Sequence, residues 1–288
     1  MKQRRTFPSD QVTSVTFTPP EGKLVAGSYS SIVLYDAATS RREAVLEKAR
    51  SNSGISNVAV SNDGRTLARA SNHFLRPGSI KLWDIGARKL KRIIPGVDTS
   101  AVSFVAFSGD GRNLFSAGGS FEQAGDVTCW DAETGVLKEV LVEHTDEISS
   151  VILSANGEVL LAQVGAKLLS WDSKTGRRTS SRTVMATDAF AASADGQRIA
   201  AVDEEASIRL LDMMTGKVRR TIRRQANVVA FSPDGRTLAA GSERGLSFWD
   251  VETGSLQWQL KTALDVHQLA FSFRRAILGS AYDSMEGD

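Results

Sequence analysis

Short apolar segments alternate with turn sequences along the whole chain, and the stretch from Phe231 to Leu260 contains most of one unit of this pattern. In and beside this stretch we predict four strands, at 228–231, 238–241, 246–249 and 256–260. The turn from Ser232 to Gly235 combines Pro, Asp and Gly, which favour the φ values and side-chain hydrogen bonds of a tight turn. Because one four-stranded sheet of this size cannot bury both of its faces, we expect it to pack against copies of itself.

Imperfect copies of this unit recur along the chain, and no segment shows a sustained helical period. The residue after the first strand recurs at intervals of 39 to 47 residues, as Thr18, Ser61, Ser108, Ser154, Ser193, Ser232 and Ser272. The third strand ends in an acid-containing pair, as Tyr35-Asp36, Trp83-Asp84, Trp130-Asp131, Trp171-Asp172, Leu211-Asp212 and Trp249-Asp250. Four short strands per repeat favour an all-β propeller of four-stranded antiparallel blades, with almost no helix.

The Ser-x-Asp-Gly turns, the Trp-Asp pairs and the Thr-Gly turns that follow them resemble the WD-repeat (beta-transducin-type) β-propeller family over nearly the whole chain. The resemblance implies a seven-bladed-type propeller. It also implies structural roles for Tyr35, Trp83, Asp84, Trp130, Asp131, His144, Trp171, Asp172, Trp249 and Asp250. Only Glu143-His144-Thr145 approximates the Gly-His dipeptide of the family. We therefore expect the family's His–Asp–Ser–Trp hydrogen-bond network to be incomplete in most blades.

The end of the chain departs from the repeat. Six complete repeats are followed by a partial seventh from about residue 266, and residues 283–288 are polar and unlike a strand. We interpret 1–288 as a single propeller domain whose last blade is incomplete, and Arg4 to Phe7 could supply its outer strand. Either the chain is a fragment of a longer protein, in which the propeller could be fused to an effector domain, or a defective blade leaves unpaired strand edges. We favour the fragment.

Composition restricts the class of protein and its compartment. Apolar residues make up 41% of the chain and charged residues 24%, which is typical of a packed core, and the net charge of +2 predicts no overall attraction to a polyanion. Cys129 is the only cysteine, so no intramolecular disulfide can form, and we interpret it as a small buried apolar residue. Since neither a signal peptide nor a membrane-length apolar run is present, we expect a cytoplasmic protein without membrane insertion.

The sequence contains no recognisable catalytic constellation. His73, His144 and His267 fall in different repeats without neighbours at metal-ligand spacing, and no nucleophile elbow, phosphate-binding loop or dinucleotide motif occurs. The first strands, such as VTFT and VAVS, show no ring of Asp, Glu, His or Arg that would face a central channel. We therefore predict a protein that is not an enzyme and holds no cofactor or metal. A propeller enzyme or small-ligand binder is the alternative.

A second alternative comes from basic residues on the predicted outer strands, which could contact nucleic acid or acidic lipid. These residues are Arg41, Arg42, Arg88, Lys89, Lys91, Arg92, Arg177, Arg178, Arg182, Lys217, Arg219, Arg220, Arg223 and Arg224. We prefer the interpretation that Lys and Arg on exposed strand edges prevent edge-to-edge pairing, so we expect no nucleic-acid partner.

Insertions distinguish the early repeats. Repeats two and three each have about five extra residues between the second and third strands, at Ser71 to Ser79 and Gly118 to Gly125, and the connections between early repeats are also longer. In a propeller these connections emerge on one face, so the additions gather on one rim around blades one to three. Apolar, aromatic and Arg residues in such loops predict a surface for a protein or peptide partner. The candidates are Arg50, His73, Phe74, Leu75, Arg76, Phe121 and Glu122.

Overall fold

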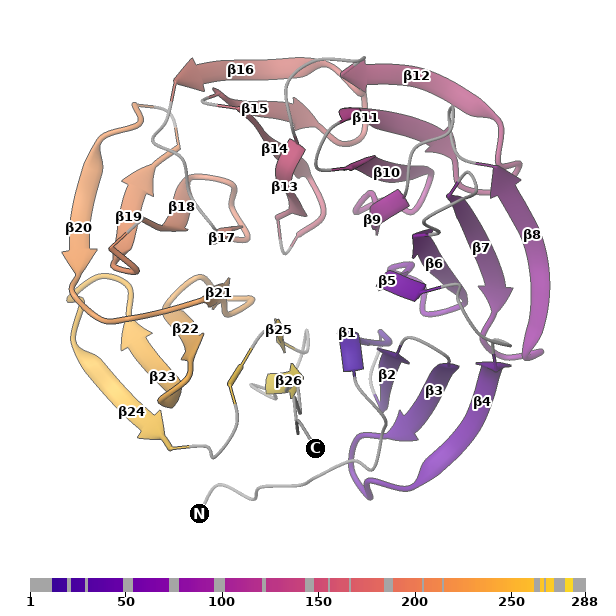
Figure 1. The fold of residues 1–288 in the computed structure, drawn as a ribbon, viewed down its shortest axis with the longest axis horizontal. Helices are drawn as coiled ribbons and strands as arrows, with labels where there is room; N and C mark the ends of the chain where they lie inside the picture. The colour runs from indigo at the N-terminus through magenta and orange to yellow at the C-terminus, as the bar shows by residue number, and fades with distance from the viewer. Residues whose placement is uncertain are drawn as a thin grey trace.

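The protein is described by a computed structural model, in which most strands and turns are placed. The described residues are 12–19, 22–28, 31–48, 54–72, 78–95, 102–120, 123–142, 148–154, 156–165, 167–183, 189–203, 205–213, 215–261, 265–266, 268–271 and 278–281. They form strands and turns, and no helix occurs among them. Figure 1 shows the sheets arranged as blades around a central axis.

Six blades have four strands each. The first three blades consist of β1 (Val12–Phe17), β2 (Lys23–Ser28), β3 (Ser31–Asp36) and β4 (Arg42–Lys48); β5 (Gly54–Val60), β6 (Thr66–Asn72), β7 (Ser79–Asp84) and β8 (Lys89–Pro95); and β9 (Val102–Phe107), β10 (Asn113–Ser120), β11 (Gln123–Asp131) and β12 (Leu137–Val142). The next three consist of β13 (Ile148–Leu153), β14 (Val159–Val164), β15 (Lys167–Asp172) and β16 (Arg178–Thr183); β17 (Ala189–Ala192), β18 (Arg198–Val202), β19 (Ile208–Asp212) and β20 (Val218–Ile222); and β21 (Val228–Phe231), β22 (Thr237–Ser242), β23 (Gly245–Asp250) and β24 (Leu256–Leu260).

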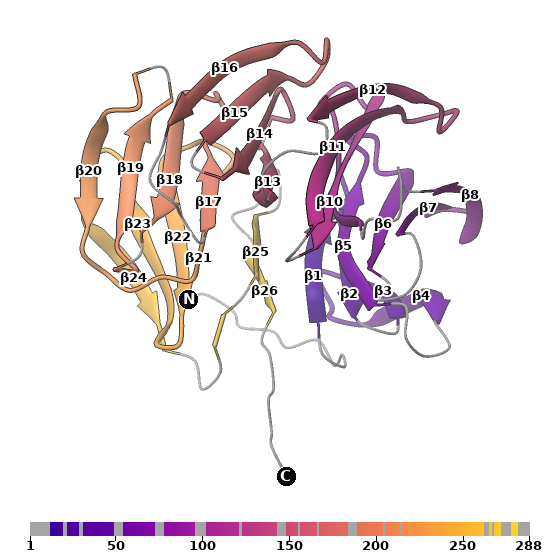
Figure 2. The same ribbon diagram turned by 45° about the horizontal axis from the view of Figure 1, so that its top comes forward.

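Each blade is an antiparallel meander in which strands pair in chain order. The first strand lies nearest the central axis and the fourth forms the outer edge, and Figure 2 shows the blades standing side by side around the ring. The all-β propeller of four-stranded antiparallel blades is therefore confirmed. In blade six the first and fourth strands have the predicted bounds.

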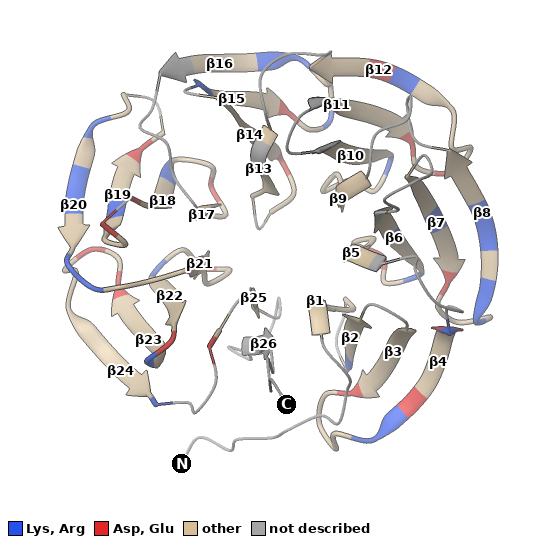
Figure 3. Cartoon of the chain, viewed as in Figure 1, with Lys and Arg blue, Asp and Glu red and all other residues tan. Residues whose placement is uncertain are grey.

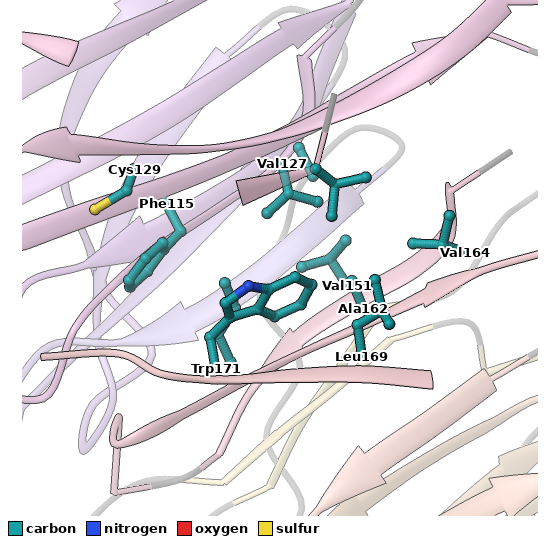
Figure 4. Packing of buried hydrophobic residues seen from close by; sticks show 11 residues of the cluster. Phe115, Val127, Cys129, Val151, Ala162, Val164, Leu169 and Trp171 are labelled. Atoms are coloured by element: carbon teal, nitrogen blue, oxygen red, sulfur yellow. The ribbon is translucent and has the colours of Figure 1, made fainter. Parts of the chain in front are cut away.

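The hydrophobic core lies between blades, because each sheet buries its faces against its neighbours. One cluster joins Phe115 and Val127 of blade three to Val151 and Trp171 of blade four, and Figure 4 shows the Trp171 indole among these side chains. Corresponding clusters join the other consecutive blades, and Ala270 packs against the core of blade one. This arrangement satisfies the expectation that one repeat is stable only when it packs against another.

The turn between the first and second strands carries the same hydrogen bonds in five blades. In blade two, the Ser61 hydroxyl donates to Asp63 Oδ1 at 2.6 Å, while the backbone N–H of Arg65 donates to Asp63 Oδ1 and that of Thr66 to Ser61 Oγ, both at 3.0 Å. The turns that begin at Ser108, Ser154, Ser193 and Ser232 repeat this pattern, with Asn156 replacing Asp in one. The short polar side chains thus satisfy backbone N–H groups that the turn leaves without strand partners.

The turn between the third and fourth strands depends on the Asp of each Trp-Asp pair. Asp131 Oδ1 accepts hydrogen bonds from the Thr134 backbone N–H at 2.8 Å and the Thr134 hydroxyl at 2.9 Å. Corresponding bonds are made by Asp36, Asp172, Asp212 and Asp250. At Asp84 only a backbone bond, from Ala87 at 2.6 Å, takes this place, because Ala stands where the other repeats have Thr.

The ring is completed by a two-stranded sheet. β25 (Gln268–Phe271) pairs with β26 (Leu278–Ala281), and β25 contacts both β21 of blade six and β1 of blade one. The described residues thus form six complete blades and this smaller sheet, and the number of seven blades stays a prediction. The segment Arg4 to Phe7, expected as an outer strand, lies outside the described residues.

Blade three differs from the prediction of a longer loop between its second and third strands. Many of the extra residues continue the hairpin instead: Gly118 pairs with Asp126, and Ser120 pairs with Gln123 after a bulge. A Cβ atom on Gly125 would lie 2.3 Å from the Gly118 carbonyl oxygen, so the absence of a side chain lets the two strands approach here. Residues 118–120 and 123–125 were wrongly predicted to be part of a loop because their small residues resemble turn residues in sequence.

Candidate functional site

The residues expected to contact a partner lie outside the described part of the chain. These are Arg50, His73, Phe74, Leu75, Arg76, Phe121 and Glu122, and the expected structural residue His144 lies outside it as well. The strands that frame these segments are described, and they show how the rim of blades one to three is built.

A pair of serines closes the base of the connection between the second and third strands in blades one and two. In blade two, Ser71 Oγ lies 3.0 Å from Ser79 Oγ, and the Ser79 backbone N–H donates to Ser71 Oγ at 3.1 Å. In blade one, Ser28 and Ser31 make the same contacts at 2.9 and 3.1 Å. The connection between Ser28 and Ser31 is short, whereas residues 72–78 separate the equivalent serines of blade two. The inserted segment therefore starts and ends at fixed points.

Hydrogen bonds between inner strands join the same three blades. The Asn57 amide nitrogen of blade two lies 3.4 Å from Ser14 Oγ of blade one, and Asn57 Oδ1 accepts a hydrogen bond from the Val105 backbone N–H of blade three at 3.1 Å. Ser14 Oγ also accepts the Val58 backbone N–H at 3.2 Å. These polar side chains of the first strands hold neighbouring blades together. An enzyme or small-ligand site in a propeller would instead need a ring of polar residues that face the central channel.

A buried group of charges lies between blades one and two. Arg69 on β6 is 1% exposed, and its Nη1 lies 3.4 Å from Glu47 Oε1 on β4. Lys81 on β7 donates to the same Glu47 oxygen at 2.6 Å. Burial lowers the pKa of the Arg69 guanidinium, and the Glu47 charge opposes that shift. The two cations and one carboxylate therefore fix blade two against the outer strand of blade one.

Arg69 stands where the other blades have a small residue, and Glu47 stands where four of the other five have an apolar residue and blade four has Arg182. The residues equivalent to Arg69 are Ala26, Ser116, Ala162, Ala201 and Ala240. Those equivalent to Glu47 include Ile94, Val142, Ile222 and Leu260. Because two departures from the repeat face each other in one interface, this contact is particular to blades one and two.

The hydrogen-bond partner of the indole N–H in the Trp-Asp pair also differs between blades. In blade three, Trp130 Nε1 donates to Ser116 Oγ at 2.8 Å, and that hydroxyl lies 2.6 Å from the Thr128 hydroxyl. In blade two, Arg69 replaces this serine, and buried Trp83 Nε1 has no hydrogen-bond partner among the described residues. Trp249 Nε1 uses a different serine, Ser247, at 2.9 Å. The Trp–Ser bond is thus not made in the same way in every blade.

Charges on the outer strands are partly paired with each other. Figure 3 shows Lys and Arg along β4, β8, β16 and β20. Arg219 forms an ion pair with Asp212, and the Arg220 side chain donates to the Glu252 carbonyl at 2.9 Å. Lys138 pairs with Asp131 at 3.0 Å, and Lys23 with Glu43 at 2.7 Å. These contacts agree with cations that protect exposed strand edges.

The described residues contain no group of three or more His, Cys, Asp or Glu residues placed to hold a metal ion. Within the same part of the chain, no helix has the length and apolar character needed to cross a membrane.

Comparison with known proteins gives two matches to WD-repeat sequences. The family model described as WD domain, G-beta repeat matches residues 216–250, which extend from the turn before β20 through the Trp249-Asp250 pair at the end of β23. The chain is also 29% identical over 150 residues to WD repeat-containing protein SL1-17 of Schistosoma mansoni. These matches and the fold support a WD-repeat β-propeller.

WD-repeat propellers typically serve as scaffolds for protein interactions, and they are generally not enzymes. The alignment with SL1-17 covers 50% of this chain and 50% of that protein. The chain therefore matches about half the length of its curated relative.

Proposed function

We propose that this WD-repeat propeller is a non-enzymatic scaffold that binds a protein or peptide through rim loops of blades one to three. The observation that carries the proposal is the concentration of insertions in these blades. In blade two the inserted residues come between β6 and β7, and in blade three the extended hairpin joins β10 to β11, so both insertions lie between a second and a third strand. In an antiparallel meander these two connections lie on the same face of the ring, so one partner could contact both.

Rigid support for these loops favours binding. The Ser71–Ser79 pair fixes the base of one loop, and Asn57 bridges the inner strands of blades one and three. A loop that starts from fixed positions loses less conformational freedom when it binds a partner. We further propose that residues 1–288 form a single seven-bladed-type domain in the cytoplasm.

The candidate contact residues include two phenylalanines, Phe74 and Phe121, in otherwise polar segments. Aromatic residues at the centre of an interface contribute a large share of binding free energy. A photo-reactive phenylalanine analogue at either position should therefore crosslink to a partner in cells.

This crosslinking experiment tests the proposed surface. The analogue is placed separately at position 74, at position 121, and at Leu137 on the outer strand of blade three, which is 43% exposed and serves as the control. Mass spectrometry then identifies the captured proteins. We expect one protein to be captured from both rim positions and not from position 137. Capture of the same proteins from all three positions, or of no protein from the rim, would reject the surface.

A further inference from the structure

Blade five contains a polar pocket on the same face of the ring as the proposed rim surface. The pocket has a volume of about 450 Å³. Its lining comes from the β18–β19 turn, from β19, and from the end of β20 with the connection that follows: Asp203, Glu205, Ser207, Arg209, Thr221, Arg223, Arg224 and Gln225. Every one of these side chains is polar or charged.

A rigid turn forms one wall of this pocket. The Asp203 carboxylate is buried, and its Oδ1 accepts the backbone N–H groups of Glu205 at 3.1 Å and Ser207 at 2.8 Å. Ala206 has a positive φ of 58°, and its carbonyl accepts the Ala226 backbone N–H at 3.0 Å. This last bond ties the turn to the connection between blades five and six. The wall is therefore held in place before any ligand arrives.

The negative charge of Asp203 is compensated inside the wall. Arg209 Nε donates to Asp203 Oδ2 at 2.8 Å. Burial alone would raise the pKa of Asp203, but the hydrogen bonds from the Ser207 amide and from Arg209 outweigh it and hold the pKa below the usual value. Asp203 is thus a satisfied structural carboxylate, and Arg209 is held against it.

The opposite wall supplies cations that have no acidic partner in the described part of the chain. The Arg224 backbone N–H donates to the Ile222 carbonyl at 2.8 Å, a tight turn that ends β20 and leaves Arg223 exposed and Arg224 half-buried. Neither of these two guanidinium groups forms an ion pair or hydrogen bond with another described residue. Arg219 and Arg220 on the same strand do have such partners, as described above. Figure 3 shows the basic end of β20 beside the acidic β18–β19 turn.

We propose that this pocket binds the phosphate group of a phosphorylated serine or threonine in a protein partner. A phosphate offers a charge near −2 and three acceptor oxygens, and Arg donates to such groups through a planar pair of N–H bonds. Arg223 and Arg224 supply the charge, and the hydroxyls of Ser207 and Thr221 can donate further hydrogen bonds.

A peptide suits this site better than a lipid headgroup. β20 is the outer strand of its sheet and pairs only with β19 among the described strands, so its other edge can pair with an extended peptide. No apolar side chain lines the pocket, whereas a membrane-binding site would usually place apolar residues beside its basic ones. The site is separate from the rim surface of blades one to three, so either proposal can fail without the other.

Binding to phosphopeptide libraries tests the site. The full chain is applied to an array of random peptides with a central phosphoserine or phosphothreonine, and to the same peptides without phosphate. Fluorescence anisotropy then gives the Kd of the strongest peptide. We expect the phosphorylated form to bind at least about tenfold more tightly, which equals about 1.4 kcal/mol. We also expect inorganic phosphate to compete.

Variants assign this binding to the pocket. Arg223→Ala with Arg224→Ala should weaken phosphopeptide binding at least about tenfold, because two charge-assisted contacts are lost. Lys217→Ala, just before the first residue of β20, is the matched control and should leave Kd within about twofold. A thermal melt checks that each variant is folded. Equal binding of phosphorylated and unphosphorylated peptides would overturn the proposal. So would unchanged binding by the double variant, or binding only to phosphatidylcholine vesicles that contain phosphatidylinositol 3-phosphate.

Discussion

The Arg69 guanidinium of blade two lies 3.4 Å from the Glu47 carboxylate of blade one, and both side chains are buried. Glu47→Gln would leave the Arg69 charge without its counterion in the interface. We expect this variant to lose about 3–5 kcal/mol of unfolding free energy in urea titrations. Glu43→Gln on the same strand is the control. Its partner Lys23 is partly exposed, so the loss should stay below about 1 kcal/mol.

A double variant that replaces both Glu47 and Arg69 tests the same contact. Glu47→Ile with Arg69→Ala gives blades one and two residue types that other blades have at these positions. Because the fully buried Arg69 charge is gone and Lys81, which also loses Glu47, is partly exposed to water, the double variant should recover most of the stability lost in Glu47→Gln. Losses that simply add would show that the two residues are not coupled.

Substitution of Asn57 should weaken contacts with more than one neighbouring blade. Its side chain accepts the Val105 backbone N–H of blade three and contacts Ser14 of blade one. Asn57→Ala leaves that N–H without its acceptor, which should cost about 1–3 kcal/mol. Hydrogen exchange should become faster at the Val105 amide. The Asn62→Ala variant is a control, because Asn62 is exposed and donates to a turn carbonyl of blade three. Unchanged exchange at Val105 in Asn57→Ala would contradict the bridge.

Two glycines of equivalent turns should tolerate alanine differently. Gly157 and Gly111 have φ values of 73° and 71°, so alanine is strained at both. A Cβ atom on Gly157 would lie 2.5 Å from Gly109 Cα in blade three, whereas one on Gly111 would meet no atom within 4 Å. We expect Gly111→Ala to cost about 1–2 kcal/mol and Gly157→Ala at least about 1 kcal/mol more. Equal losses would show that the blades do not touch there.

Carboxylates of the repeated turns should make the free energy of unfolding depend on pH in the acid range. Hydrogen bonds from Arg219 and Thr215 lower the pKa of Asp212 to about 2, and those from Thr134 and Lys138 lower the pKa of Asp131. Since the folded-state pKa is below the unfolded value near 4, their contribution is present above about pH 4 and is lost as the pH falls toward 2. Asp131→Asn with Asp212→Asn should therefore reduce the slope of stability against pH in this window. The exposed Glu133→Gln is the control, and an unchanged slope in the double variant would contradict the assignment.

The repeat could be predicted from sequence because each turn carries its own chemistry. Ser232 and Asp234 hydrogen-bond the backbone of one turn and Asp250 that of another, so these residues indicate where strands end. The contacts between blades could not be predicted in this way. Arg69 and Glu47 are distant in sequence, and each resembles a common polar residue of an exposed strand.

The candidate sites could also be predicted only in part from the sequence. The insertion in blade two was recognised by its length, but length alone did not show that the extra residues of blade three continue β10 and β11. The cations of β20 were interpreted together as edge protection, and that interpretation suits Arg219. Only the fold brings Arg223 and Arg224 beside the Asp203 turn to form a pocket. In the structure, the connection between β18 and β19 is longer than those between the second and third strands of blades one, four and six.

Binding of the crosslinked partner to purified protein is the most direct test of the scaffold proposal. Its Kd is measured for the wild type, for Phe74→Ala with Phe121→Ala, and for Val136→Ala, a 62% exposed residue on the outer side of blade three. We expect the double rim variant to bind at least about tenfold more weakly and Val136→Ala to bind like the wild type. Unchanged affinity in a folded double rim variant would contradict the proposal.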